Sequence, residues 1–396
     1  MISTVGIVGQ GYVGLPLALA ISRAGFKVYG IDNDKQLVEM LNSGKSKIED
    51  IDNSELSEQI SAKKYEATLD FSKLNNCEVK IVCVPTPLLN SKPDLSFLTD
   101  AVIKIGKYLN KGDLILIEST IGPGTTRDLI IPLLEQESGL KQEEFHIVFS
   151  PERIDPKNGL WNLRNTPKLV AGNTPEATKI ASNFYSQFIN SIVECENFEV
   201  AETAKLLENT FRLINISFIN EISMFCYKLG IDVNSVVEAA ATKPYGFMPF
   251  YPSIGVGGHC IPVDPLYLAQ KANEVGAPTQ FIDLADQVNQ NMPNYFLGRA
   301  EVKIGQLKGK RVLIIGVSYK PNIADIRETP VARLITGLKS KGAQVFWHDD
   351  LVKEWNGEKS VALSNEYDLA IIATPHTYLD LTKLGDMPIL DTRGSI

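Results

Sequence analysis

Cysteine is scarce in this sequence. The chain has five, namely Cys77, Cys83, Cys195, Cys226 and Cys260, and no two of them have C-x-x-C spacing. An odd number of widely spaced cysteines is not typical of a disulfide-stabilised fold. A zinc site needs closely spaced ligands, which these cysteines do not provide. We therefore expect a cytoplasmic protein, from a reducing compartment, with no metal site.

Long apolar runs and an excess of positive charge are also absent. No uncharged stretch approaches the roughly 18 residues that cross a membrane, and the N-terminus enters a strand pattern without a basic leader. Lys and Arg number 39 against 47 Asp and Glu, which gives a net charge of -8. A general basic field for nucleic acid is excluded, so we expect neither a membrane nor a nucleic-acid partner.

What is present is a globular composition in a chain of 396 residues, which is long enough for two or three domains. Strand Val5–Gly9, a helix from about Leu15 to Ala24 and strand Lys27–Asp32 form a predicted β-α-β unit. More strands and helices alternate after it, which is typical of a parallel, doubly wound sheet.

Helical spacing dominates the middle of the chain. It predicts one long helix over Val200–Leu229, a second over Val233–Ala241 and a third over Phe281–Asn291. After Pro293, strands and helices alternate again, beginning with a strand at Arg311–Gly316. We predict an α/β protein in which a central helical domain with a long helix (197–295) joins two Rossmann-like, doubly wound parallel-sheet domains (1–196 and 296–396).

The clearest motif is Gly9-Gln10-Gly11-Tyr12-Val13-Gly14, a G-x-G-x-x-G sequence between a strand and a helix. Its glycines permit a tight turn and close approach to a pyrophosphate, which meets the free N–H groups of the helix. Asp32 ends the next strand, where its carboxylate can bind a ribose 2′-hydroxyl and would repel a 2′-phosphate. Asp34 adds to that repulsion, so the pattern predicts NAD rather than NADP. The second half has no complete fingerprint, so we expect it to bind a different ligand.

Three further segments follow predicted strands, where open α/β sheets bind their ligands. They are Cys83-Val84-Pro85-Thr86-Pro87, Glu118-Ser119-Thr120 and Ser150-Pro151-Glu152-Arg153. Taken alone, they would be ordinary loops or solvated charges. Next to the fingerprint, they are candidates for the same crevice.

A glycine-rich segment, Gly255–Pro265, presents Cys260 directly after His259, with Asp264 four residues further on. Glycines let backbone approach a ligand, and a cysteine placed after them is a candidate nucleophile. The alternative is inert packing, which we assign to the other four cysteines.

Charged and amide side chains add weaker signals. Lys205 and Asn209 share one face of the long helix, although a lysine with its ammonium in solvent would fit the same pattern. Lys320, Arg327 and Arg393 in the last domain could together bind a nucleotide diphosphate, while each alone would be surface charge.

These motifs resemble, in order and over nearly the full length, the UDP-glucose/GDP-mannose dehydrogenase family. Further carriers of the resemblance are Glu202-Thr203-Ala204-Lys205-Leu206 with Asn209, Gly257-Gly258-x-Cys260, and Tyr319-Lys320 through Asp325-x-Arg327-Glu328. The resemblance implies a Rossmann NAD domain, a helical dimerisation middle that forms a homodimer, and a C-terminal domain that binds the nucleotide sugar.

The resemblance also implies roles. Cys260 would be the nucleophile, Lys205 and Asn209 would stabilise the oxyanion, Asp264 and Thr120 would handle the hydrolytic water, and Glu152 would be a substrate-side carboxylate. The expected cofactor contacts are Gly9, Gly11, Tyr12, Val13, Gly14, Asp32, Pro85, Thr86, Thr120 and Arg327. The expected substrate contacts are Glu152, Arg153, Lys205, Asn209, Arg212, Tyr251, Gly257, His259, Lys320 and Arg393.

The implied chemistry is oxidation of a sugar C6 alcohol to a carboxylate with two NAD. Cys260 adds to the intermediate aldehyde, and the thiohemiacetal is oxidised to a thioester that water hydrolyses. Relatives in the UDP-glucose branch usually carry a lysine where this chain has Val263. The segment therefore looks like the N-acetylhexosamine branch, closer to its N-acetylglucosamine than to its N-acetylmannosamine enzymes. The product would enter surface polysaccharide synthesis.

Other functions fit part of the pattern. A two-electron hydroxyacid or 6-phosphogluconate-type dehydrogenase would need neither Cys260 nor a third domain. A non-catalytic sensor would bind NAD and nucleotide sugar without making NADH, and an NAD-dependent epimerase would recycle its cofactor. UDP-N-acetylmannosamine and UDP-glucose remain alternative substrates.

Overall fold

The chain forms two compact units, Met1–Leu207 and Glu208–Ile396, and the division falls within helix α7 (Phe198–Leu229). The computed structural model describes residues 2–48, 51–155 and 158–394. Each unit contains a sheet and helices, so the predicted α/β class with two Rossmann-like sheets is confirmed. The boundaries at residues 196 and 295 stay predictions.

The first unit is built on an eight-stranded sheet with the order β10-β9-β8-β7-β4-β1-β2-β3. Its central strands are short, apolar and buried on both faces, as strands of parallel sheets are. The strands are β1 (Thr4–Val8), β2 (Lys27–Ile31), β3 (Tyr65–Thr68), β4 (Val79–Val82), β7 (Leu114–Ile117), β8 (His146–Phe149), β9 (Lys168–Gly172) and β10 (Ile192–Glu194).

One pair in this sheet departs from the parallel prediction, because β9 runs antiparallel to β8. A parallel neighbour needs a long crossover, usually a helix. The described residues between Phe149 and Lys168 contain no helix. This irregular segment carries Glu152 and Arg153, so the reversal places two predicted site residues in a loop.

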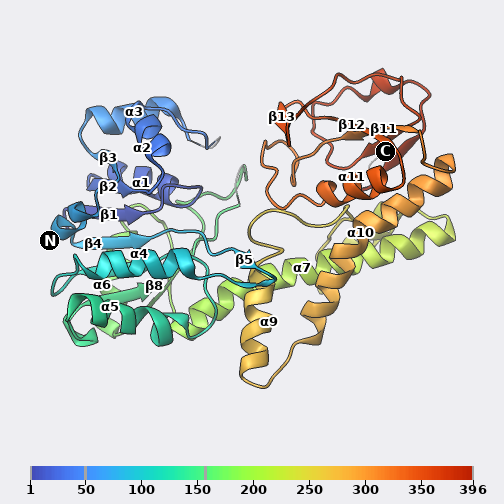
Figure 1. Cartoon of the computed structure of the whole chain (residues 1–396). Helices are drawn as coiled ribbons and strands as arrows, with labels where there is room; N and C mark the ends of the chain where they lie inside the picture. The colour runs from blue at the N-terminus through green and yellow to red at the C-terminus, as the bar shows by residue number, and fades with distance from the viewer. Residues whose placement is uncertain (1, 49–50, 156–157, 395–396) are drawn as a thin grey trace. The chain divides into compact units, whose positions relative to one another are not determined.

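Helices cover both faces of the sheet. One core contains side chains of α1 (Gly14–Arg23), α2 (Lys35–Asn42), α3 (Asn53–Ser61) and α6 (Pro175–Tyr185). The other contains side chains of α4 (Ser96–Gly106) and α5 (Ile131–Ser138), which lie alongside each other (Figure 1). The remaining elements are the hairpin β5 (Leu88–Leu89) and β6 (Lys92–Pro93), η1 (Phe71–Asn76), η2 (Thr126–Ile130) and η3 (Gln142–Glu144).

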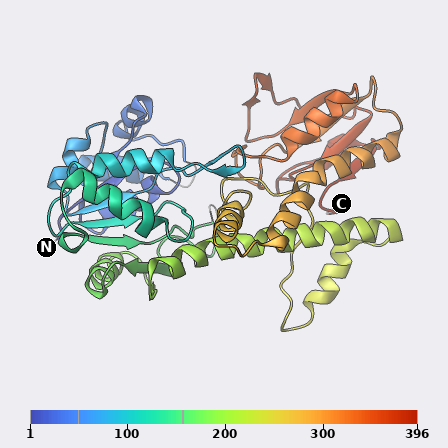
Figure 2. The same ribbon diagram turned by 60° about the horizontal axis from the view of Figure 1, so that its bottom comes forward.

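The second unit has a smaller parallel sheet with the order β12-β11-β15-β16. The strands are β11 (Arg311–Ile315), β12 (Gln344–His348), β15 (Leu369–Ile372) and β16 (Ile389–Asp391), and a hairpin pairs β13 (Glu354–Trp355) with β14 (Glu358–Lys359). Its helices are α8 (Val233–Ala241), α9 (Asp264–Glu274), α10 (Gln280–Ile304), α11 (Val331–Ser340) and the short η4 (Leu381–Leu384). The end of α7 turns back into α8 (Figure 2), and the two share a small apolar cluster.

Helix α10 continues well past Asn291, where the sequence predicted its end, and contains Pro293. A proline inside a helix removes one backbone bond and opposes the helix. Met292, Phe296 and Ala300, however, are buried in the same core as α11. Packing of this face therefore overrides the local preference.

Within the described part of the chain, no helix combines the length and apolar character that a membrane crossing requires.

Candidate active site

The glycine fingerprint forms the turn between β1 and α1. Gly9 has φ +94°, and a Cβ there would lie 2.4 Å from the carbonyl oxygen of Cys83. At Gly14 a Cβ would lie 1.8 Å from the oxygen of Gly9, whereas at Gly11 nothing lies within 4 Å. Glycine is thus required at positions 9 and 14 because a side chain there would collide with the protein's own backbone. At Gly11 there is open space beside the N-terminus of α1. This arrangement fits a pyrophosphate.

Asp32 directly follows β2 and is bonded to that turn. Its Oδ2 accepts from the backbone N–H of Gln10 at 2.8 Å, and its Oδ1 accepts from Asp34 N–H at 3.0 Å. Each carboxylate oxygen has a second lone pair, so the group can still accept from a ribose hydroxyl. Asp34, expected only to repel a 2′-phosphate, also caps α2 by accepting from the N–H groups of Gln36 and Leu37.

The loops after β4 and β7 are bonded to each other. Thr86 Oγ1 donates to the carbonyl of Thr120 at 2.7 Å, and Ser119 Oγ donates to the carbonyl of Val84 at 2.8 Å. The structure therefore brings the predicted cofactor residues Thr86 and Thr120 together, with Pro85 next to them in the chain.

Glu202 of α7 holds the continuation of the second loop. Its carboxylate accepts from Gly124 N–H at 2.6 Å, Thr126 N–H at 3.0 Å and Thr126 Oγ1 at 2.6 Å. Burial raises the pKa of Glu202, although these bonds act in the opposite direction. Lys205, buried on the same helix, follows less than one turn later. The sequence signal for this role is a glutamate at a buried position of an otherwise apolar helix face.

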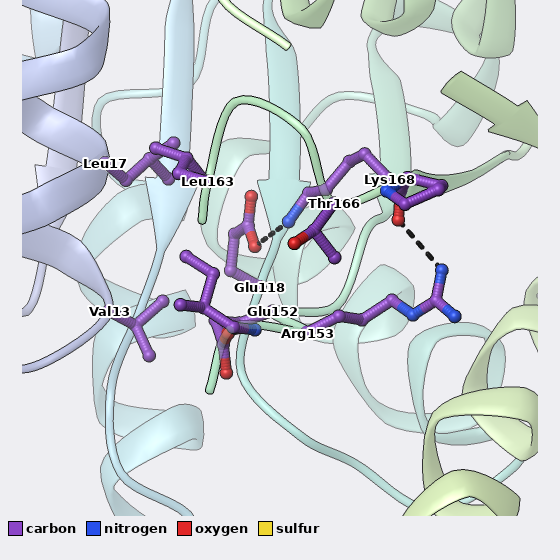
Figure 3. A pocket seen from close by; sticks show the side chains of 10 residues that line it. Val13, Leu17, Glu118, Glu152, Arg153, Leu163, Thr166 and Lys168 are labelled. Carbon is purple, nitrogen blue, oxygen red and sulfur yellow. Dashed lines mark hydrogen bonds and ion pairs between the residues drawn. The ribbon is translucent and has the colours of Figure 1, made fainter. Parts of the chain in front are cut away.

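Glu118 lies in a buried polar cluster that the sequence did not predict. The Lys168 ammonium donates to Glu118 and to the carbonyl of Pro151, and the Tyr185 hydroxyl donates to Glu118 at 2.5 Å. Figure 3 shows the Glu118 and Lys168 side chains pointing toward one another. Burial raises the pKa of Tyr185, and the Glu118 charge raises it further. Glu118 thus anchors the segment that precedes Glu152.

Glu152 and Arg153 line a hollow in the first unit, together with Val13 from the fingerprint. Arg153 donates through Nη1 to the carbonyl of Pro167 at 2.8 Å (Figure 3). The Glu152 carboxylate accepts from the backbone N–H of Ile154. Residues predicted to contact cofactor and substrate therefore meet here. The other lining residues are Leu17, Glu118, Ile154, Leu163, Thr166, Pro167 and Lys168.

In the second unit, two predicted catalytic residues form a buried pair. The amide Nδ2 of Asn209 donates to Asp264 Oδ2 at 2.6 Å, and both side chains are buried. Asp264 is the first residue of α9, and its N–H donates at 2.9 Å to the carbonyl of Cys260. Cys260 itself is exposed. One turn of chain thus joins an accessible thiol to a fixed carboxylate.

The glycines before Cys260 pack against the segment that follows β11. A Cβ at Gly257 would lie 2.6 Å from the carbonyl oxygen of Glu328 and 2.8 Å from Cβ of Tyr319. Gly258 has φ +83°, and its N–H donates to the carbonyl of Arg327 at 3.1 Å. This contact explains why the segment needs glycine, and it places His259 near Arg327.

Burial lowers the pKa of His259, and the Arg327 guanidinium lowers it further. Arg327, the predicted cofactor contact, is half-buried and donates from Nε to both carboxylate oxygens of Asp325 at 2.9 Å. The sequence did not show that Asp325 orients this guanidinium.

The remaining predicted substrate contacts are dispersed over the second unit. Burial lowers the pKa of Arg393, whose carbonyl accepts from Asn234 Nδ2 at 3.1 Å. The carbonyl of Lys320 accepts from Ser318 Oγ at 2.9 Å. Arg212 and Tyr251 are exposed. Their assignment to the substrate stays a prediction.

Comparison with known proteins covers nearly the whole chain. Three models of the UDP-glucose/GDP-mannose dehydrogenase family match: the NAD binding domain over residues 3–189, the central domain over 199–291 and the UDP binding domain over 313–396.

Two relatives and one solved structure illustrate the similarity. A UDP-N-acetyl-D-glucosamine 6-dehydrogenase from Pseudomonas aeruginosa is 36% identical over 94% of this chain and 87% of its own length. A UDP-N-acetyl-D-mannosamine dehydrogenase from Pyrococcus horikoshii is 31% identical over 94% of this chain and 89% of its own length. The structure of a UDP-D-ManNAc dehydrogenase from Pyrococcus horikoshii aligns with a TM-score of 0.91 at 30% identity, covering 98% of this chain and 95% of that one. The chain therefore belongs to the UDP-glucose/GDP-mannose dehydrogenase family, as an oxidoreductase that uses NAD.

Proposed function

We propose that this enzyme oxidises the C6 hydroxyl of a UDP-N-acetylhexosamine to the uronic acid through a covalent intermediate on Cys260. UDP-N-acetylglucosamine is the favoured substrate. The higher identity to the N-acetylglucosamine relative than to the N-acetylmannosamine relative supports this choice, and so does Val263 in place of a lysine.

The observation that carries the proposal is the arrangement around Cys260. This thiol is exposed and lies one turn from Asp264, which Asn209 holds at 2.6 Å. The other thiols are less suited to attack. Cys77, Cys83 and Cys226 are buried, Cys195 is partly buried, and burial raises the pKa of Cys77 to about 12. A nucleophilic cysteine must be accessible and reach the thiolate form.

When bound, NAD accepts the hydride at each of two oxidations. Between them, the Cys260 sulfur forms a bond to the aldehyde carbon, and the carbonyl oxygen takes a proton. After the second oxidation, water attacks the thioester carbon, the carbon–sulfur bond breaks and the thiolate leaves. The balance is one alcohol, one water and two NAD giving one carboxylate, two NADH and three protons.

In this scheme the protein supplies charge and proton transfer. The Lys205 ammonium stabilises the oxyanion that develops on the C6 oxygen, and Asn209 keeps Asp264 in position. Asp264, at the start of α9, takes a proton from the hydrolytic water.

The decisive experiment measures how much NADH forms from a limiting amount of each UDP-sugar. We expect two NADH per UDP-N-acetylglucosamine, and a loss of acid formation on the order of 10⁴-fold or more in Cys260→Ala. The matched variant Cys195→Ala should retain activity. One NADH per sugar, or full activity in Cys260→Ser, would establish a two-electron dehydrogenase instead. Tight binding of NAD and UDP-sugar without formation of NADH would indicate a non-catalytic sensor.

We also propose a homodimer that forms through α7. Five large apolar side chains of this helix are at least 44% exposed, and their spacing of four or seven residues places them along one stripe. They are Leu207, Phe211, Phe218, Phe225 and Leu229. Sedimentation of wild type and of the double variant Phe218→Glu/Phe225→Glu tests this. A wild-type monomer, or an unchanged dimer in the variant, would contradict it.

A further inference from the structure

The loop after β11, from Val317 to Asn322, carries Lys320, the predicted substrate contact. Neighbouring side chains hold it. Thr374 Oγ1 donates to the carbonyl of Ser318 at 2.8 Å, and Asn322 Oδ1 accepts from Thr377 N–H at 3.1 Å. Asn322 has φ +65°, in the left-handed region, so this end of the loop needs support to keep its shape.

His376 supplies that support. Its Nδ1 accepts the backbone N–H of Asn322 at 2.8 Å, and its ring is fully buried. Because Nδ1 is the acceptor, the neutral ring carries its proton on Nε2. That atom lies 3.1 Å from Oδ2 of Asp349.

Asp349 holds the opposite end of the same loop. Its Oδ2 accepts from Val317 N–H at 2.9 Å, and its Oδ1 accepts from the N–H groups of Leu351 and Val352 at 2.9 and 3.0 Å. Asp349 and His376 therefore form a bridge that joins the first and last residues of the loop, with Lys320 between them.

We propose that His376 is a positioning residue for nucleotide-sugar binding, because it fixes the shape in which the 317–322 loop presents Lys320. The inference rests on the proposed nucleotide-sugar substrate and on the predicted contact of Lys320 with it. The ring is inaccessible and both of its nitrogens face protein groups, so it acts through the loop and does not touch the substrate.

Two substitutions distinguish the contribution of Nδ1 of His376 from that of Nε2. In His376→Asn, the amide oxygen can take the place of Nδ1 and keep the bond to Asn322. In His376→Gln, the amide nitrogen can take the place of Nε2 and keep the contact with Asp349, while the Asn322 N–H loses its acceptor. The bond to Asn322 is the one that shapes the loop, so the two variants should differ.

The experiment measures the affinity for UDP by calorimetry and the steady-state constants for UDP-sugar and NAD. In His376→Gln, we expect the Kd for UDP and the KM for the sugar to rise about tenfold, with kcat and the KM for NAD changed less than about threefold. In His376→Asn, UDP affinity should stay within about threefold of wild type. His348→Gln alters a buried histidine of the same unit outside the loop, and it should leave UDP affinity unchanged.

Equal UDP affinity in both His376 variants, accompanied only by lower thermal stability, would overturn the proposal. If His376→Gln does not fold, Asn322→Ala keeps the ring but removes the amide acceptor and the left-handed preference. UDP affinity should then fall, and wild-type affinity there would also overturn the inference. Because UDP is the probe, failure of the proposed oxidation would appear separately, as absent NADH in the wild type.

Discussion

The turns that follow β1 and β11 have the same backbone hydrogen bonds but different surroundings. The N–H of Gly9 donates to the backbone carbonyl of Ile31 at 2.8 Å, and the N–H of Gly316 donates to the backbone carbonyl of His348 at 2.9 Å. The next residue in each turn donates to an aspartate, Gln10 to Asp32 and Val317 to Asp349. Asp32 is partly exposed, whereas Asp349 is 1% exposed and faces the His376 ring.

The helices that follow the two turns also begin at different distances. Helix α1 begins at Gly14, directly after its turn, while α11 begins only at Val331. In the first unit, an open helix N-terminus and an available carboxylate lie next to each other, as a dinucleotide requires. In the second unit, the segment up to Pro330 separates the turn from the start of α11. The carboxylate of Asp349 already contacts backbone N–H groups and the His376 ring. One turn geometry can therefore bind a ligand or hold a loop, depending on the segment that comes after it in the chain.

The largest expected effect comes from the first glycine of each turn. In Gly9→Ala and Gly316→Ala, the new Cβ would lie 2.4 and 1.9 Å from a carbonyl oxygen, at φ +94° and +80°. We expect each change to lower the free energy of unfolding by about 2–4 kcal/mol. Urea unfolding measures this.

Gly11→Ala is the matched control for that pair. Its Cβ would meet no protein atom within 4 Å, so stability should be retained while NAD affinity falls because the pyrophosphate space is filled. If Gly11→Ala were as unstable as Gly9→Ala, the distinction between structural and ligand-facing glycines would be wrong.

The next effect concerns the two aspartates. In Asp32→Ala, the KM for NAD should rise about 10–100-fold, which is the effect expected from losing one hydrogen bond to a charged group. The affinity for UDP should stay unchanged. In Asp349→Ala, UDP affinity and stability should fall, while the KM for NAD stays unchanged. Titration of both variants with NAD and UDP measures this. A loss of NAD affinity in Asp349→Ala would remove the contrast between the two turns.

The smallest effect is a pH dependence. Burial alone would raise the pKa of Asp349, but His376 and the N–H groups of Val352 and Val317 lower it to about 2. Because this is below the unfolded value of about 3.9, the stabilisation is complete above that pH and is lost as the pH falls through about 2. Urea unfolding of wild type and Asp349→Asn between neutral and acid pH should therefore show a difference that shrinks in acid. A difference independent of pH would contradict this.

Much of the fold was predictable because periodicity is local. Helix α8 has the predicted bounds, and strands β1, β2 and β11 lie within one residue of the predicted bounds at each end. Pro293 misled the prediction because the packing of α10 on α11 depends on residues distant in sequence. The antiparallel β8–β9 pair had no local signal at all.

The candidate site divides in the same way. The fingerprint and the Cys260 segment are continuous motifs, so they could be recognised directly. Lys168 and Tyr185 contact Glu118 from 50 and 67 residues away, and His376 contacts Asn322 from 54 residues away. Only the folded chain brings such pairs together, because no motif in the sequence links two residues that lie so far apart.

Helix α7 constrains how this sequence can change. Lys205 and Asn209 are four residues apart on one uninterrupted helix, and each residue of an α-helix turns the chain by about 100°. Loops tolerate insertions and deletions, but one residue added or lost between these two positions would rotate one side chain away from the other. We expect the length of this stretch to be invariant among functional descendants, even where its apolar residues are exchanged.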